Sequence, residues 1–330
     1  MSEPLTVGLG LSEDVPLDQQ QRLARDVEAA GLTSLWTNEA SGRDALLVCQ
    51  AWAHATSRLE VGVGVLPIWS RSPAQIAMAA ATLQEASAGR FVLGLGVSHP
   101  VTMDRWHGVT YRRPRAAASD VLAILQSAFE ADRTDHDGEV FSARSLRLAI
   151  HPRPPRPRTL LAAMGPRMLD LAGAAADGVL LNWSGPIAVG HAAQRVRAAA
   201  HAAGRDGHVA AYVRIAVDPD RAAARAALAR EFGNYAALPA YAAHFERQGL
   251  AAAVAVAQDV QAAGAGTDEL SAAVDDEALA SIGLWATPDD DLSAALQTWA
   301  DAGLDHLVAR VVRVGDDALV SARHALTALS

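Results

Sequence analysis

Short apolar runs and longer amphipathic runs alternate along the whole chain. The short runs have the length and composition of buried strands, and the longer runs repeat apolar residues at helical spacing. Eight short runs are expected to form strands: 5–11, 35–39, 59–66, 91–97, 159–164, 178–182, 209–217 and 306–312. Eight strands separated by helices predict parallel pairing with helical crossovers, and at this chain length they predict an α/β fold of the TIM-barrel type, (β/α)8.

Helices are expected between these strands, and several carry start or stop signals. Gly31 follows the first helix, while Ser72-Pro73 and Thr287-Pro288 each place a capping side chain before a proline. The expected helices cover 16–30, 43–56, 73–88, 116–129, 187–203, 288–302 and 317–329, with one more beginning at Pro166.

A few segments depart from the simple alternation. A small hairpin is expected at 139–148, before the fifth strand, followed by a Pro/Arg linker at 151–157. The segment 218–283 is longer than one crossover needs and is expected to be a helical insertion near strand seven. The polar segment 98–114 has no regular period, which suggests a loop at a site. All of these fit within one domain, 1–330.

Composition and charge exclude several classes of protein. The net charge of -9 has the wrong sign for holding nucleic acid phosphates, so no nucleic acid partner is expected. All 28 basic residues are Arg. A Walker-type phosphate loop, a Schiff-base aldolase and a pyridoxal-phosphate enzyme each require a lysine amine, so these classes are excluded.

The sequence has no clear motif for a disulfide, a metal site, a signal peptide or a membrane span. Cys49 is the only cysteine, so neither an internal disulfide nor a cysteine zinc site is expected. The start of the chain does not have the pattern of a signal peptide, and no run reaches the about 20 apolar residues of a membrane span. Asp135, His136 and Asp137 stand beside Gly138 and are interpreted as a solvated turn, with no metal. A cytoplasmic protein without a membrane partner is expected.

The carboxyl ends of the strands are where a barrel carries its chemistry. Gly62 and Gly64, and again Gly94 and Gly96, remove bulk from two strand ends, which indicates room for a planar ligand; tight packing alone is the alternative. The second pair lacks the third glycine of a dinucleotide fingerprint, so a Rossmann site has little support.

An anion site is predicted at the end of strand five. Gly165 and Pro166 begin a helix there, so that free N–H groups, the helix dipole and Arg167 would face a phosphate. A plain helix start with a solvent-facing Arg167 is the alternative.

Other strand ends add polar and aromatic groups. Asn38 and Glu39 end strand two, and Asn182, Trp183 and Ser184 end strand six. The titratable candidates near this mouth are Glu39, His99 and His107, each of which is either catalytic or structural. The residues alone therefore indicate a barrel that binds a flat, phosphate-bearing ligand.

These motifs together resemble the luciferase-like monooxygenase superfamily, and within it the oxidoreductases that use the deazaflavin coenzyme F420. The resemblance covers almost the whole chain. It rests on 38–40 with 42–44, 62–67 with 71–73, 89–100, 106–109 with Tyr111, 163–169, 176–183 and 211–214.

The resemblance implies a TIM barrel with the cofactor across its mouth and a non-prolyl cis peptide at Gly64–Val65. It implies hydride transfer between deazaflavin C5 and an unsaturated carbon or imine, or the reverse oxidation, with His99 handling a proton and Glu39 as the second candidate. The cofactor-binding residues that it implies are Asn38, Gly64, Val65, Gly96, Val97, Ser98, Met164, Gly165, Pro166, Arg167 and Asn182.

The resemblance also implies a homodimer and a small organic substrate. Some sugar-phosphate dehydrogenases of the family end strand two with Asp-His, whereas this chain has Asn38-Glu39, which speaks against a sugar phosphate. A monooxygenase that uses flavin mononucleotide (FMN) and a barrel that binds ligand without turnover are the alternatives. The loops 101–113 and 232–250 are expected to shape the substrate pocket, with Tyr235, Tyr241 and His244 either lining it or packing helices.

Overall fold

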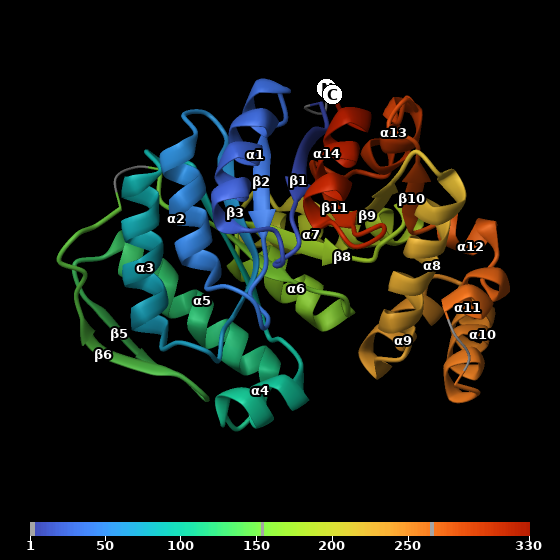
Figure 1. Cartoon of the computed structure of the whole chain (residues 1–330). Coiled ribbons are helices and arrows are strands. Elements are labelled where there is room, and N and C mark those ends of the chain that lie inside the picture. Colours follow the sequence, from blue (N-terminus) through green and yellow to red (C-terminus); the bar gives the residue numbers. More distant parts are fainter. Residues whose placement is uncertain (1–3, 153–154, 265–266) are drawn as a thin grey trace.

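A computed structural model describes residues 4–152, 155–264 and 267–330, and its centre is a closed parallel barrel (Figure 1). Each barrel strand pairs in parallel with the next, and β11 pairs with β1 to close the ring. The TIM barrel expected from the sequence is confirmed. The barrel strands are β1 (Thr6–Gly10), β2 (Ser34–Thr37), β3 (Glu60–Pro67), β4 (Phe91–Gly96), β7 (Arg158–Ala162), β8 (Gly178–Asn182), β9 (His208–Val217) and β11 (His306–Val312).

Helices surround the barrel, and local sequence explains how several begin. The Ser72 hydroxyl accepts from the Gln75 N–H and the Gln75 side chain accepts from the Ser72 N–H, which is a capping box. The Asp44 carboxylate caps the helix after β2 by accepting from the N–H groups of Leu46 and Leu47. The surrounding helices are α1 (Leu17–Ala29), α2 (Ala45–Ala55), α3 (Pro73–Ala86), α5 (Pro114–Glu130), α6 (Pro166–Ala175), α7 (Pro186–Ala202), α13 (Ser293–Asp301) and α14 (Ala318–Ala328).

Two boundaries differ from the sequence prediction. Helix α13 begins at Ser293 and not at Pro288, because the Asp290 carboxylate accepts the Thr287 N–H and closes a turn there. The segment 98–114 is not wholly irregular, since it contains α4 (Pro100–His107). Only Met103 of this short helix is buried, so its sequence shows no apolar period.

The hairpin before the fifth barrel strand starts earlier than expected. It consists of β5 (Thr134–Asp137) and β6 (Ser142–Leu146), which pair antiparallel. The interpretation of Asp135, His136 and Asp137 as a turn was wrong, because these residues form β5. The buried Asp120 carboxylate holds the hairpin, accepting from the N–H groups of 140 and 141 and lying 3.1 Å from His136 Nε2. The linker 151–157 lies partly outside the described residues.

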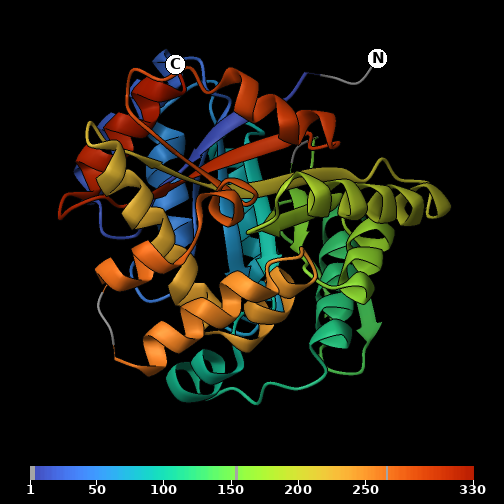
Figure 2. The same ribbon diagram turned by 90° about the vertical axis from the view of Figure 1, so that its right-hand side faces the viewer.

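The insertion after β9 is helical, as expected. It holds α8 (Arg221–Ala236), α9 (Pro239–Glu246), α10 (Ala251–Ala262), α11 (Thr267–Ala273) and α12 (Asp276–Ala280); residues 265–266 of it lie outside the described part. Figure 2 shows these yellow and orange helices as a group beside the barrel, and α8 packs against α9, α10 and α11. The strand β10 (Gly283–Ala286) follows the insertion and pairs with the carboxyl-terminal part of β9, from Arg214 to Val217. The sequence analysis did not predict this strand.

Large side chains fill the barrel, and glycines on neighbouring strands make room for them. A Cβ atom on Gly62 would lie 2.5 Å from the ring of Trp36, and one on Gly64 would lie 2.5 Å from the Tyr212 hydroxyl. A Cβ on Gly96 would meet Val65 at 2.5 Å. Tight packing, the alternative interpretation of these glycines, therefore accounts for their small size.

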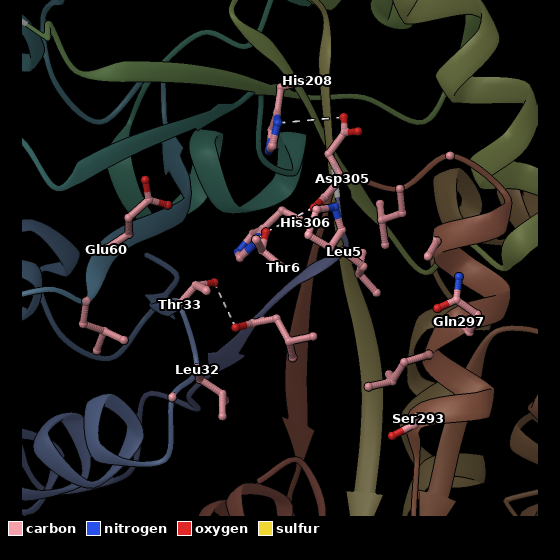
Figure 3. A pocket seen from close by; sticks show the side chains of 18 of the residues that line it. Leu5, Thr6, Leu32, Thr33, Glu60, His208, Ser293, Gln297, Asp305 and His306 are labelled. Atoms are coloured by element: carbon pink, nitrogen blue, oxygen red, sulfur yellow. Dashed lines mark hydrogen bonds and ion pairs between the residues drawn. The ribbon is translucent and has the colours of Figure 1, made fainter. Parts of the chain in front are cut away.

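The N-terminal end of the barrel holds a buried polar network (Figure 3). The Thr6 hydroxyl lies 2.7 Å from His306 Nδ1, and the Ser34 hydroxyl lies 2.7 Å from His306 Nε2. Burial, with a smaller contribution from His208 and Arg158, lowers the pKa of His306 to about 3. His306 is therefore neutral in the folded protein at neutral pH.

Two further observations complete the fold. Cys49 is buried in α2, as expected. Across the described residues, no helix combines the length and the apolar character that crossing a membrane would need.

Gly62 is expected to tolerate no larger side chain, because Trp36 is 1% exposed and has no space to move into. We expect Gly62→Ala to lower the free energy of unfolding by about 1–3 kcal/mol, as overpacked cores do, measured by urea denaturation. Gly190→Ala is the matched control, since the nearest atom to its added Cβ is Ala302 O at 3.6 Å. An unchanged midpoint for Gly62→Ala would contradict this packing.

Stability is expected to fall as the pH drops from 7 to 5. The pKa of His306 is lowered on folding, so below pH 6.5 the unfolded chain binds a proton that the folded chain does not. This costs about 1.4 kcal/mol of stability per pH unit, until the folded pKa of about 3 is reached. Urea unfolding at each pH measures the slope. His306→Asn should reduce it without abolishing it, because burial also lowers the pKa of His208 and of His244 to about 4, and the exposed His201→Asn should leave it unchanged. Equal slopes for both variants would reject this role of His306.

Candidate functional site

The carboxyl ends of the barrel strands form one rim, the mouth, with α4 and α9 at the same end of the molecule (Figure 1). The predicted site residues follow β2, β3, β4, β7 and β8, which are consecutive neighbours around the ring. The barrel therefore places them along one continuous stretch of the rim. The remaining strands, β9, β11 and β1, contribute residues that the sequence analysis did not select.

Glu39 is held in an ion pair on the rim. Its Oε1 and Oε2 accept from Arg71 at 2.5 and 3.0 Å, and the second Arg71 nitrogen also donates to Asp44 at 2.6 Å. The Arg71 and Glu39 side chains are only 19% and 14% exposed. The hydrogen bond to Glu39 raises the pKa of Arg71. The carboxylate of Glu39 is thus fully engaged with its neighbours.

Asn38 is oriented by groups from the first and last strands. Its Nδ2 donates to Glu13 Oε1 at 2.7 Å, and its Oδ1 accepts from Arg310 Nη2 at 2.9 Å. Arg310 also donates to the Leu11 carbonyl, and burial lowers the pKa of Arg310. The orientation of the Asn38 amide is therefore determined by protein partners on both sides.

Asn182 belongs to a cluster built around a buried arginine. Arg214 is 3% exposed, donates to Asn182 Oδ1, and donates to the Tyr235 hydroxyl at 3.1 Å. Its guanidinium lies 4.6 Å from the ring centre of Trp183, a cation–π contact. The Asn182 amide donates to the Tyr241 hydroxyl at 2.8 Å, and burial raises the pKa of Tyr241 to about 12.

The arginines of this rim were missed, although the sequence contains a sign of them. Arg214 is the one charged residue inside the apolar part of β9, and Arg310 has the same position in β11. A charge in an otherwise buried strand must find a partner, which is reason to place it in a polar site. Two of the pocket residues expected in 232–250 contact this cluster directly: Tyr235 contacts Arg214, and Tyr241 contacts Asn182.

The ends of β3 and β4 are irregular. The Gly64–Val65 peptide bond is cis, and the register between these strands shifts between Gly64 and Leu66. Just past β4, Ser98 has a φ of 57°, a conformation that non-glycine residues rarely adopt and that clusters at functional sites. The Val97 carbonyl accepts from Trp69 Nε1 at 3.0 Å.

His99 lies at the start of α4 and is half-buried. No hydrogen bond joins its imidazole to any residue in the described part of the chain. His107 lies in the last turn of the same helix and is exposed. Of these two histidines, His99 is thus the one next to the rim residues Val97 and Ser98.

The end of β7 has the features of an anion site. The helix α6 starts with Pro166, which has no N–H, and it has no side-chain cap. The N–H groups of residues 168–169 donate to the Gly165 carbonyl, so the Arg167 N–H is the one of this turn left for an anion among the described contacts. A Cβ on Gly165 would have nothing within 4 Å. Arg167 is exposed, and no carboxylate of a described residue pairs with it. Met164 lines a cavity of about 630 Å³ next to this helix start.

A larger cavity, of about 1490 Å³, lies at the opposite end of the barrel (Figure 3). Four of its charged groups pair with one another: Arg158 with Glu60 and Arg197 with Asp305, both at 2.7 Å. At the mouth, neither His99 nor Arg167 pairs with a side chain of the described residues. In the described residues, no group of three or more His, Cys, Asp or Glu side chains is placed to hold a metal ion.

The family model described as luciferase-like monooxygenase matches residues 4–306 of this chain. A 5,10-methylenetetrahydromethanopterin reductase of Methanolobus tindarius is 29% identical over 68% of this chain and 69% of its own length.

Solved structures share the fold. A coenzyme F420-dependent tetrahydromethanopterin reductase from Methanopyrus kandleri has a TM-score of 0.84, with 21% identity and 98% of each chain covered. An F420-dependent secondary alcohol dehydrogenase in complex with an F420–acetone adduct has a TM-score of 0.76, with 17% identity and 99% of each chain covered. Because the family match spans nearly the whole barrel, the chain is an enzyme of the luciferase-like monooxygenase family.

Proposed function

We propose that this chain is a coenzyme F420-dependent oxidoreductase that acts on a small organic molecule with an unsaturated carbon or an imine, or catalyses the reverse oxidation. The observation that carries the proposal is the start of α6 without a side-chain cap, beside Arg167, with which no carboxylate of a described residue pairs; two structural neighbours of the barrel are F420-dependent enzymes. The assignment of direction and substrate within this class is part of the proposal.

The residues at the end of β7 fit the phosphate group of the coenzyme. The backbone at Gly165 is open to a ligand, and the Arg167 N–H and guanidinium, with which no carboxylate of a described residue pairs, are donors that suit an anion. When bound, coenzyme F420 donates or accepts a hydride at C5 of its deazaflavin ring. The residues proposed to hold it are Asn38, Gly64, Val65, Gly96, Val97 and Ser98 around the ring and Met164, Gly165, Pro166, Arg167 and Asn182 around the phosphate side.

His99 is the better candidate for moving a proton. Glu39 has both carboxylate oxygens bound to Arg71, so neither oxygen is free to contact a substrate. The imidazole of His99 has no competing partner among the described residues, and an imidazole exchanges protons near neutral pH. We assign proton transfer at an imidazole nitrogen to His99, and the positioning of the loop before α2 to Glu39.

Aromatic side chains make up the rest of the mouth, on the side where a substrate would bind. Trp183, Tyr235 and Tyr241 form an apolar wall over the buried Arg214. Hydrogen bonds fix Tyr235 and Tyr241, and burial fixes Trp183, so this wall would orient a substrate without rearranging. Asn38-Glu39 at the end of β2 favours a substrate other than a sugar phosphate.

The assembly is also part of the proposal: a single domain, 1–330, that acts in the cytoplasm as a homodimer. Neighbouring helices α2 and α3 expose Leu47 and Met78 to 68% and 57%, and such apolar side chains on one face are typical of an interface. Light scattering that gives the mass of one chain would reject the homodimer.

A titration with coenzyme F420 and, separately, with FMN tests the function. A monooxygenase that uses FMN is the second candidate because the family model carries that description. The deazaflavin has carbon where flavin has N5, and it does not support oxygenation, so preference for FMN would replace the proposal with the monooxygenase. Binding of neither would favour a barrel that binds another ligand without turnover.

Arg167 is expected to bind the phosphate. We predict that Arg167→Gln raises the Kd for coenzyme F420 by about 10- to 100-fold, as losing a charged hydrogen bond does, with kcat at saturating coenzyme nearly unchanged. Fluorescence titration measures the Kd. The exposed Arg323→Gln on α14 is the control. Equal affinities for both variants would remove the phosphate assignment.

His99 is expected to act on turnover and not on coenzyme affinity. We predict that His99→Asn lowers kcat by about 10²-fold or more, as losing a general acid does, and removes one limb of the pH profile, with the Kd for coenzyme F420 little changed. His107→Asn is the control on the same helix. An unaltered pH profile in His99→Asn would show that His99 is structural.

A further inference from the structure

Two tyrosines of the insertion bring their hydroxyl groups to the ends of barrel strands. Tyr235 from α8 and Tyr241 from α9 are both half-buried, and their ring centres lie 4.6 Å apart with the rings nearly perpendicular. The Tyr235 hydroxyl contacts Arg214 of β9. The Tyr241 hydroxyl contacts Asn182 at the end of β8. Because a phenol hydroxyl can accept and donate hydrogen bonds, the direction of these contacts decides what it can offer a ligand.

Arg214 determines that direction for both tyrosines. A guanidinium carries only N–H groups and cannot accept, so the Tyr235 oxygen accepts from Arg214 Nη2 at 3.1 Å. For the same reason, the amide atom of Asn182 that faces Arg214 is Oδ1. The other amide atom, Nδ2, therefore donates to the Tyr241 oxygen at 2.8 Å. Both tyrosine oxygens are acceptors in this network.

The O–H protons of these two tyrosines consequently remain available to a ligand. Within residues 4–152, 155–264 and 267–330, neither hydroxyl donates to an acceptor of the protein. Tyr212 of β9 differs, because its hydroxyl donates to the Thr37 carbonyl at 3.3 Å. Two O–H donors on rings that contact each other suit a ligand group with two acceptor oxygens.

The guanidiniums beside these donors lack a hydrogen-bonded carboxylate among the described residues. Arg214 and Arg310 are register partners on the neighbouring strands β9 and β11, so their side chains point to the same side of the sheet. Neutral amide oxygens accept from them: Asn182 from Arg214 and Asn38 from Arg310.

The nearest carboxylate to Arg214 is too distant for a hydrogen bond. Glu231 Oε1 lies 3.9 Å from Arg214 Nε, and this nitrogen has no hydrogen-bond partner in the described part of the chain. Arg214 is only 3% exposed. A buried guanidinium in this condition favours the approach of an anion.

We propose that the hydroxyl groups of Tyr235 and Tyr241 bind a carboxylate of the substrate, so that the enzyme acts on an unsaturated organic acid, or forms one in the reverse direction. The inference rests on the proposed function and names its substrate class. The two O–H groups bind the carboxylate oxygens, and Arg214 supplies positive charge behind them. The two tyrosines are specificity-determining residues from outside the barrel strands.

The test uses matched acids and amides that differ in charge but not in carbon skeleton. Cinnamate with cinnamamide is a large pair, and crotonate with crotonamide is a small one. Calorimetric titration of the protein loaded with oxidised coenzyme F420 measures the Kd of each compound. Wild-type protein should bind the acid of a pair about 10-fold more tightly than the amide, as hydrogen bonds to a charged group allow.

Removing one hydroxyl at a time separates the donors from their rings. Tyr235→Phe and Tyr241→Phe should each weaken binding of the acid by about 10-fold and change binding of the amide much less. Tyr212→Phe is the matched control. Because the Tyr212 hydroxyl already donates to Thr37, its loss should lower the free energy of unfolding in urea and retain the preference for the acid.

Each other outcome overturns the inference in a distinct way. Wild-type protein that binds the acids no better than the amides, or binds neither acid up to its solubility limit, has no carboxylate site. Weaker binding of both acid and amide in Tyr235→Phe would mean that this hydroxyl only holds Arg214 in place. Weaker binding of coenzyme F420 in either tyrosine variant would assign the hydroxyls to the coenzyme.

The proposed function fails separately from this inference. Wild-type protein that does not bind coenzyme F420 at all would reject the proposed function, and the substrate class with it. Wild-type protein that binds the coenzyme but shows no preference for the acids would reject the carboxylate site alone.

Discussion

The parallel pairing of β11 with β1 closes the sheet, and the arrangement of the mouth depends on that closure. In its register Thr6 lies opposite His306 and Gly10 lies opposite Arg310, so the two strands begin together. Closure brings Asn38 and Arg310, which are 272 positions apart, into a direct hydrogen bond. With every barrel strand parallel, all carboxyl ends meet at one rim and all amino ends at the other.

Charged groups at the mouth are arranged so that most of them hold one another. Glu39 binds Arg71, Glu13 binds Asn38, and Arg214 is stacked on Trp183 while it binds Asn182. A buried charge without a partner is costly, so these networks resist rearrangement and give the rim a fixed shape. The groups left without partners, such as the Arg167 guanidinium, are for that reason the ones able to act on a ligand.

The insertion adds side chains to the mouth that the barrel strands do not supply. Tyr235 and Tyr241 from α8 and α9 complete the Arg214 cluster, and Gln248 holds the end of α9 against the strand end at Trp183. The strands contribute the rim, whereas these helices contribute side chains from outside the barrel, and function depends on the site that is built on a fold and not on the fold itself. Specificity is expected to depend more on the insertion than on the strands.

The sequence by itself determined the barrel, because alternating strand and helix patterns of this number leave few other topologies, and it identified residues along five neighbouring strand ends. It did not show α4, whose single buried residue leaves no period, or β10, which directly follows the insertion and is an extra strand beside β9. It also did not decide between His99 and Glu39, since both are polar residues beside a strand end. Only the tertiary structure placed Arg71 against Glu39 and left His99 without a partner, because contacts between distant segments depend on closure of the barrel and not on local sequence.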